Sequence, residues 1–269
     1  MKITHLLGIG AIAMTVAACT TNPITGRSSL QLANNSEILT MSAQEYKSTL
    51  AKGKVISGTA DAKRVANVGN RIKAAAEKYY QSIGRSADLA NYKWEFNLLQ
   101  SNELNAWCMP GGKVAVYTGI LPVTKDENGL AVVMGHEVSH ALAGHGNERI
   151  SQAMVAQYGG AILGSTISNA QWANIFQQVY PVGSQVALLK YGRNQESEAD
   201  EMGLYLMSMA GYDPRAAIPF WSRMEAASEG SSRPPQFLST HPNPETRISS
   251  IQEKLPKALE YYKAAGGKI

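Results

Sequence analysis

The pentapeptide His136-Glu137-Val138-Ser139-His140 constrains the fold of this chain more than any other feature. Two histidines four residues apart share one face of an α-helix, so both imidazoles can reach one metal ion. The glutamate after the first histidine then lies beside that ion, where it can act as a base. So short a pattern also arises by chance, and the alternative is a helix with two surface histidines. The flanking residues decide between them.

The flanking sequence favours a buried helix. Thr124 and Glu127 have the spacing of a capping box, apolar residues recur with helical spacing from Leu130 to Leu142, and Gly144 is a stop signal. An unpaired polar side chain is costly in such a helix, which disfavours two idle histidines. The pattern is therefore typical of a zinc-dependent peptidase site.

Such a site needs a third protein ligand and an open fourth position. His145 lies five residues after His140, about 140° around the helix, so it points away from a metal that His140 binds. We interpret His145 as a cap or as a hydrogen-bond partner of a ligand, with metal ligation as the alternative.

A second predicted helix, from residue 194 to residue 209, supplies the missing ligand. Glu196, Asp200 and Gly203 share one of its faces, whereas Glu198 points elsewhere. Glu196 can complete a His-His-Glu site, Asp200 can accept the second N–H of a ligand imidazole, and Gly203 permits a close helix contact. The alternative is that these acidic residues are a solvated helix N-terminus that complements the helix dipole.

Two further stretches extend the pattern. Residues 105–112 (NAWCMPGG) and 114–119 (VAVYTG) precede the metal helix, and residues 239–242 (STHP) are followed by Arg247. With the two metal motifs they resemble the zinc metallopeptidases that include the CAAX prenyl endopeptidases, the HtpX-like quality-control proteases and the beta-barrel assembly-enhancing protease. The likeness covers about residues 40–255 and is greatest to the small periplasmic lipoprotein members.

The resemblance implies a fold and a set of roles. The fold is α+β, a mainly helical zincin-like domain with a small antiparallel sheet and the metal helix. One Zn²⁺ per chain is expected on three ligands: His136, His140 and Glu196. Glu137 is the expected general base, Asp200 orients a ligand, and His241 and Arg247 stabilise the oxyanion. Two alternatives stay open: His241 occupies the open zinc position at rest, or His241 and Arg247 are ordinary loop and helix residues.

The upstream segment predicts a place for substrate. Asn105 and Ala106 offer small side chains beside backbone with which an extended protein substrate can pair. Pro110-Gly111-Gly112 predicts a turn into a strand at residues 114–117, and the alternating stretch 92–96 is its expected neighbour. The alternative is a structural hairpin without a substrate role.

The N-terminus predicts export. An apolar run from Leu6 to Ala18 precedes Cys19, which indicates a signal peptide at residues 1–18 and lipidation of Cys19. Residues 19–40 then form a polar tether, and Thr20 favours the outer membrane, facing the periplasm. A signal peptide without lipidation is the alternative.

The remaining residues, 41–269, suit one domain. A net charge of +4 without a polybasic run argues against nucleic acid as a partner. Helices are expected to begin at Ser42 and to span Thr59–Gly84, and Pro256 is expected to interrupt a terminal helix pair. Residues 151–189 carry no charge and form either a lid or membrane-facing surface, or two buried helices.

Two functions fit this sequence. The first is a zinc endopeptidase that cleaves unfolded or misassembled cell-envelope proteins. The second is a zinc-stabilised chaperone or assembly factor with latent peptidase activity.

Overall fold

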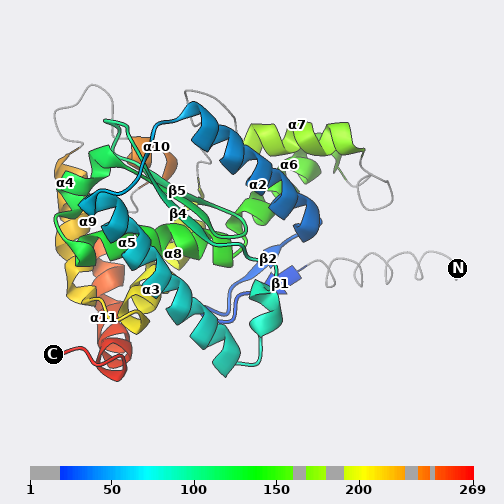
Figure 1. Ribbon diagram of the computed structural model, residues 1–269. Helices are drawn as coiled ribbons and strands as arrows, with labels where there is room; N and C mark the ends of the chain where they lie inside the picture. Colours follow the sequence, from blue (N-terminus) through cyan, green and yellow to red (C-terminus); the bar gives the residue numbers. More distant parts are fainter. Residues whose placement is uncertain (1–18, 160–167, 180–190, 228–235, 243–245) are drawn as a thin grey trace, which may run out of the picture.

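The computed structural model describes residues 19–159, 168–179, 191–227, 236–242 and 246–269 (Figure 1). Helices lie on both faces of a small sheet, with α9 and α11 at one end of the molecule and α6 and α7 at the other. This mainly helical α+β architecture confirms the predicted fold class.

The central sheet is mixed. Its strands are β3 (Val55–Ile56), β4 (Glu95–Leu99), β5 (Ala106–Met109) and β6 (Lys113–Tyr117), in the spatial order β3-β4-β6-β5. The β5–β6 pair is an antiparallel hairpin, as predicted, and Gly111 and Gly112 turn it with φ of 83° and 79°. β4 is the predicted neighbour of β6 but runs parallel to it, Glu95 opposite Lys113. The chain runs from β4 to the edge strand β5 and only then turns back as β6 between them, so β6 has the same direction as β4. The expectation of a purely antiparallel sheet was therefore wrong for the β4–β6 pair.

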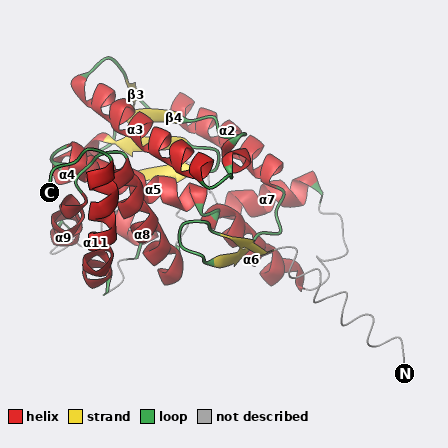
Figure 2. Ribbon diagram, turned by 90° about the horizontal axis from the view of Figure 1, so that it is seen from below, coloured by secondary structure: helices red, strands yellow, loops and turns green. Residues whose placement is uncertain are grey.

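Alternation along β6 divides the core between the two faces of the sheet. The helices that pack on it are α2 (Asn35–Lys52), α3 (Ala60–Ser82) and α5 (Glu127–Leu142). Val114 and Val116 join α3 and α5 in the main core, whereas Ala115 and Tyr117 pack with Tyr46 of α2. Figure 2 shows the strands between these helices. The two-residue period of the strand therefore fixes which face receives the metal helix.

The N-cap of the metal helix α5 lies two residues later than predicted. Thr124 ends the short helix α4 (Leu121–Thr124), and the side chain of Asp126 caps α5 by accepting from the Gly129 N–H at 2.9 Å. Both residue types cap helices, and the turn after α4 places Asp126 at the correct position. Gly144, in the left-handed region at φ 68°, separates α5 from α6 (His145–Tyr158), as the stop signal predicted.

Two glycines bring α8 (Arg193–Met209) against α5. A Cβ on Gly203 would lie 2.7 Å from the His136 backbone nitrogen, and one on Gly135 would lie 2.9 Å from the Gly203 carbonyl oxygen. Only glycine permits this backbone contact. The predicted close approach at Gly203 is confirmed.

The other elements complete the frame. They are η1 (Ser86–Leu89), η2 (Thr118–Ile120), α7 (Asn169–Val179), η4 (Pro214–Ala216), α9 (Ala217–Ala226), α10 (Gln236–Thr240) and α11 (Arg247–Ala264). The helix predicted at Thr59–Gly84 is α3, which spans Ala60–Ser82 with Thr59 as its N-cap. However, α2 begins at Asn35 with Asn34 as its cap, so Ser42 lies inside the helix. α11 continues through Pro256, and both Pro256 and Gln252, the residue whose carbonyl a proline at this position cannot bond, are exposed.

The segment expected to be a free tether is folded. β1 (Cys19–Thr21) pairs antiparallel with β2 (Ser28–Leu30), and this N-terminal hairpin, residues 19–30, hydrogen-bonds to α6 and α8. The predicted signal peptide at residues 1–18 lies outside the described residues. Within the described part of the chain, no helix has both the length and the apolar character needed to cross a membrane.

Part of the uncharged segment 151–189 is helical. The end of α6 and all of α7 bury Met154, Ile175, Phe176 and Val179 in a small core. This arrangement agrees with the alternative of two packed helices, although Val155 of α6 is exposed. Residues 160–167 and 180–190 lie outside the described ranges, so the lid hypothesis is untested there.

Candidate metal centre and active site

The two histidines of α5 point to one spot. The helix places them one turn apart, and their Nε2 atoms are 3.0 Å from each other. Both side chains are buried. Asp200 of α8 lies 2.9 Å from Nδ1 of His136. A carboxylate can only accept, so His136 carries its proton on Nδ1 and presents a lone pair at Nε2.

Glu196 and His241 complete the cluster. Glu196, from the first turn of α8, places one carboxylate oxygen 3.4 Å from His140 Nε2 and the other 3.5 Å from His136 Nε2. His241 follows α10, and its Nδ1 is 3.2 Å from His136 Nε2 and 2.9 Å from Glu196. One ligand atom from each of the four residues falls within 4.8 Å of all the others.

These distances fit one coordination shell. A tetrahedron with bonds of about 2.05 Å to its centre has edges of about 3.3 Å, and the cited donor separations lie on either side of that value. Three imidazole nitrogens and a carboxylate oxygen are ligands that suit zinc. The residues present therefore fit a zinc ion. The structure places His241 beside the three predicted ligands, which agrees with the alternative that His241 occupies the fourth position.

Charge and burial compete inside the cluster. Burial alone would raise the pKa of Glu196, but His241 and the other histidines outweigh it and hold that pKa well below the ordinary value. Burial lowers the pKa of His140 well below the ordinary value. The pKa of His241 is lowered by burial but raised by a larger amount by Glu196 and Glu137, with a net rise. The site thus combines a negative carboxylate with an imidazole kept neutral by burial.

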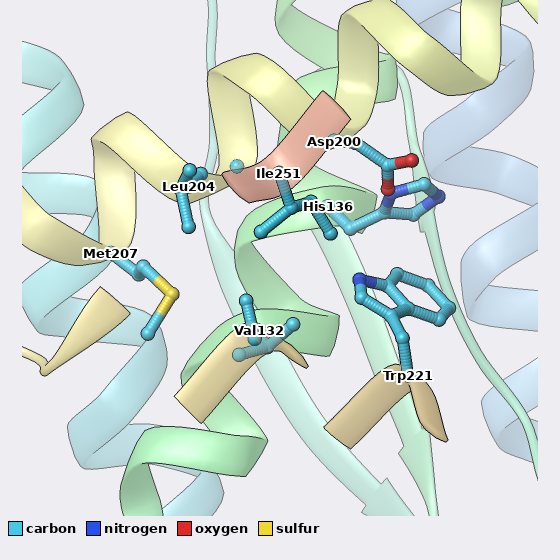
Figure 3. Close-up of a pocket in the computed structure, with 9 residues that line it drawn as sticks. Val132, His136, Asp200, Leu204, Met207, Trp221 and Ile251 are labelled. Atoms are coloured by element: carbon cyan, nitrogen blue, oxygen red, sulfur yellow. The ribbon is translucent and has the colours of Figure 1, made fainter. Parts of the chain in front are cut away.

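Apolar residues support the Asp200 side of His136. Figure 3 shows Asp200 beside the His136 ring, with the Trp221 indole below it. The adjacent small pocket is lined mainly by apolar side chains: Val132, Leu204, Met207 and Ile251. Apolar surroundings have a low dielectric constant, which strengthens the hydrogen bond between Asp200 and His136. Asp200 therefore lies where helical phase predicted it.

Arg247 has different partners from those expected. Its Nε donates to Asp200 at 2.7 Å, its Nη2 donates to Glu196 at 2.6 Å, and the guanidinium lies 4.0 Å from the centre of the Trp221 ring. The side chain is buried. Instead of stabilising an oxyanion, as predicted, Arg247 connects the carboxylate of Glu196 to that of Asp200, which contacts His136. Its Nη1 has no hydrogen-bond partner among the described residues.

Glu137, the acidic residue between the two motif histidines, stays outside the cluster. Its Oε1 is buried, makes no hydrogen bond within the described residues, and lies 3.4 Å from His241 Nε2. Burial raises the pKa of this carboxyl, and His241 and His136 reverse the rise only in part. A buried carboxyl beside a metal shell with free acceptor capacity can take a proton from water.

The predicted substrate edge is covered. Asn105 and Ala106 are 3% and 1% exposed. Ala106 N–H donates to the Asn105 side chain at 2.9 Å, and the Phe237 N–H of α10 donates to the Leu104 carbonyl at 3.2 Å. The main chain of α10 is therefore attached directly before Asn105, and the same helix leads into His241 of the cluster.

Sequence reasoning missed two aromatic contacts. The ring of Tyr191 stacks on His140 at 3.8 Å, and that of Phe237 stacks on His241 at 4.4 Å. The spacing Phe237-x-x-x-His241, one helical turn, was an available signal for the second contact. Tyr191, directly before α8, carries no such signal. His145 and Glu198, which point away from the shell as predicted, hydrogen-bond to each other at 3.0 Å.

Comparison with known proteins gives a consistent result. The model of Peptidase family M48 matches residues 67–255. Mitochondrial metalloendopeptidase OMA1 of Schizosaccharomyces pombe is 37% identical over 170 residues, 63% of this chain and 49% of the relative. Metalloendopeptidase OMA1 of Bos taurus is 30% identical over 251 residues, 89% of this chain and 46% of the relative. Beta-barrel assembly-enhancing protease of Escherichia coli is 27% identical over 192 residues, 66% and 38% respectively. The chain spans about half the length of the curated relatives it matches first.

Proposed function

The chain belongs to peptidase family M48 and is a metallopeptidase, and from this premise we propose that it is a zinc endopeptidase of unfolded or misassembled cell-envelope proteins. The observation that carries the proposal is the buried cluster of His136, His140, Glu196 and His241 next to a Glu137 oxygen that accepts no hydrogen bond from the described residues. A chance motif would leave no reason for two helices and a distant loop to bring these donors together.

The residues of this chain divide the work. His136, His140 and Glu196 would hold the metal, and Glu137 would take the proton from the attacking water and pass it to the leaving amine. When bound, zinc supplies a Lewis acid that lowers the pKa of coordinated water to about 7. Asp200 keeps the lone pair of His136 Nε2 directed at the metal. Arg247 is not placed to contact a carbonyl, and we assign it the alignment of Glu196 and Asp200.

His241 favours a resting form in which it fills the fourth position. Its Nδ1 lies 3.2 Å from His136 Nε2, and Phe237 of α10 donates to the Leu104 carbonyl, directly before Asn105. Displacement of α10 would free the fourth position and the Leu104 carbonyl together. His241 would then be available to hydrogen-bond to a reacting carbonyl. The same closed geometry supports the second candidate function, a zinc-stabilised chaperone or assembly factor whose peptidase activity is latent.

The cellular setting rests on the N-terminal sequence. The apolar run that ends at Ala18 and the following Cys19 support export and lipid anchoring, and an envelope location fits the likeness to the beta-barrel assembly-enhancing protease. The mitochondrial names of other relatives leave a second setting for the same chemistry. Replacement of Cys19 by serine is expected to release the protein from bacterial membranes into the soluble fraction. An unchanged distribution would refute lipid anchoring.

The decisive experiment compares the full chain with its Glu137→Gln variant. Both are loaded with zinc and incubated with an unfolded protein substrate, and the zinc content of both is measured. Cleavage by the parent alone, with one zinc in each, would support the peptidase and the role of Glu137. Stoichiometric zinc without cleavage by either would favour the latent assembly factor. Cleavage that persists in Glu137→Gln would contradict the assignment of the base.

A further inference from the structure

Three residues of the N-terminal hairpin converge on one carboxylate that neither binds the metal nor lines the cluster. Asn22 Nδ2 donates to Glu198 at 2.8 Å, and the Thr25 hydroxyl and Arg27 Nε donate to the same group. The Glu198 side chain is only 3% exposed. So many donors on one buried carboxylate fix its direction.

The Arg27 side chain spans two carboxylates. Its two terminal nitrogens donate to Glu148 of α6 at 2.9 and 2.8 Å, while its Nε donates to Glu198 of α8. Glu148 also accepts from Gln195 of α8 at 2.7 Å. A planar guanidinium can make these bonds at once, which the single ammonium of lysine cannot do. The hairpin therefore fixes α6 and α8 relative to each other at this point.

A hydrogen-bond path continues from Glu198 to the metal cluster. His145 Nε2 lies 3.0 Å from Glu198, and His145 Nδ1 lies 2.8 Å from His140 Nδ1. Because the carboxylate can only accept, His145 donates from Nε2, and in the neutral ring Nδ1 is the acceptor. His140 must then donate from Nδ1. That tautomer leaves the lone pair of His140 on Nε2, the atom that faces Glu196 and His136.

The two ligand histidines are thus oriented by different means. Asp200 fixes His136 directly, whereas His140 depends on a second histidine and a carboxylate whose direction is set by the hairpin. We propose that Arg27 is a positioning residue that acts through Glu198 and His145 to hold His140 in the tautomer that binds the metal. This inference rests on the metal site proposed above, and it makes the hairpin, residues 19–30, a working part of that site.

The test measures metal binding rather than cleavage alone. Zinc affinity of the full chain is determined by competition with a chelator, and the coordination of the Co²⁺-substituted protein is followed by its visible absorption spectrum. Replacing groups that orient a metal ligand weakens metal affinity by about 10–100-fold. Because Arg27 acts through two intermediates, we expect Arg27→Gln to fall near the lower end, about 10-fold, with an altered Co²⁺ spectrum.

Arg85→Ala is the matched control. Arg85 holds the same hairpin by donating to the Thr21 carbonyl at 3.3 Å, but within the described part of the chain it makes no hydrogen bond or ion pair with Glu148 or Glu198. If Arg27 merely fastens the hairpin, both variants should lose similar zinc affinity. The proposal expects Arg85→Ala to keep the parent affinity and spectrum. Should Arg27→Gln fail to fold, Arg27→Lys takes its place, since it keeps the charge but not the fork.

A double-mutant cycle identifies the route. In a His145→Gln background the path to His140 is already altered, so adding Arg27→Gln should weaken zinc binding no further. Independent, multiplicative losses would overturn the proposal, as would parent-like affinity in Arg27→Gln. A parent protein that binds no stoichiometric zinc would instead refute the metal site itself. The two failures are therefore distinguishable.

Discussion

A methyl group at Gly203 is expected to separate the two halves of the metal site. The Cβ of a Gly203→Ala variant would lie 2.7 Å from the His136 nitrogen and 2.9 Å from the Gly135 carbonyl carbon. Both are backbone atoms of α5, so no side-chain rotation can relieve the contact. Ordinary contact begins near 3.4 Å, which requires α8 to move from α5 by about 0.7 Å or α5 to bend. Overpacking of this kind costs about 1–3 kcal/mol of unfolding free energy.

The same shift would reach the ligands. Glu196 lies on α8 two turns before Gly203, and its oxygens are 3.4 and 3.5 Å from the nitrogens of His140 and His136. A displacement of about 0.7 Å is a large part of a metal–ligand bond of about 2 Å. We therefore expect Gly203→Ala to weaken zinc binding by at least about 10-fold in addition to its effect on stability.

Urea unfolding of the metal-free protein and chelator competition measure the two effects separately. Gly192→Ala, just before α8, is the control, because a Cβ there meets only a side-chain oxygen at 3.8 Å. Its unfolding free energy should change by less than about 1 kcal/mol. If Gly203→Ala matched the parent in both measurements, the argument that backbone contact sets the α5–α8 distance would be wrong.

Three further predictions concern the hydrogen bonds around the cluster. Asp200→Asn can donate to Nδ1 of His136 and so favours the wrong tautomer; zinc affinity should fall about 10–100-fold in a chelator competition, and an unchanged affinity would contradict the orienting role. His241→Ala should change the basal cleavage rate, and raise it if His241 blocks the fourth position; a parent-like rate and zinc shell would exclude the resting form. Burial would raise the pKa of Glu148, but its bonds to Arg27 and Gln195 lower it below the ordinary value. The stability that ionised Glu148 contributes is therefore fully present above the ordinary pKa of a glutamate and is lost as the pH falls through the lowered pKa. The unfolding free energies of the parent and of Glu148→Gln should converge in acid.

Helical phase made the centre of the site predictable. His136, His140, Glu196 and Asp200 are spaced by whole turns on two helices, and each such spacing specifies a face without knowledge of the fold. Gly203 was predictable for the same reason, because it continues the face of Glu196. These positions depend on local geometry, which the sequence records directly.

Features that depend on distant contacts were not predictable. Alternation along β4 is the same for a parallel and an antiparallel neighbour, so the direction of the β4–β6 pair could not be inferred from it. Arg27 lies in a polar turn, and nothing near it in sequence indicates two carboxylates from α6 and α8. Arg247 was assigned a partner by resemblance, whereas the position of α11 gives it Glu196 and Asp200.

The placement of His241 at the end of α10 has a consequence for inhibition. In the resting form proposed above, a compound that binds the metal would have to take the position of His241, so it would bind only molecules in which α10 has opened. Its apparent affinity is then the intrinsic affinity reduced by the open fraction. At high inhibitor concentration the onset of inhibition would approach the rate of opening, and a variant with a loosened α10 would be inhibited faster and more tightly by the same compound.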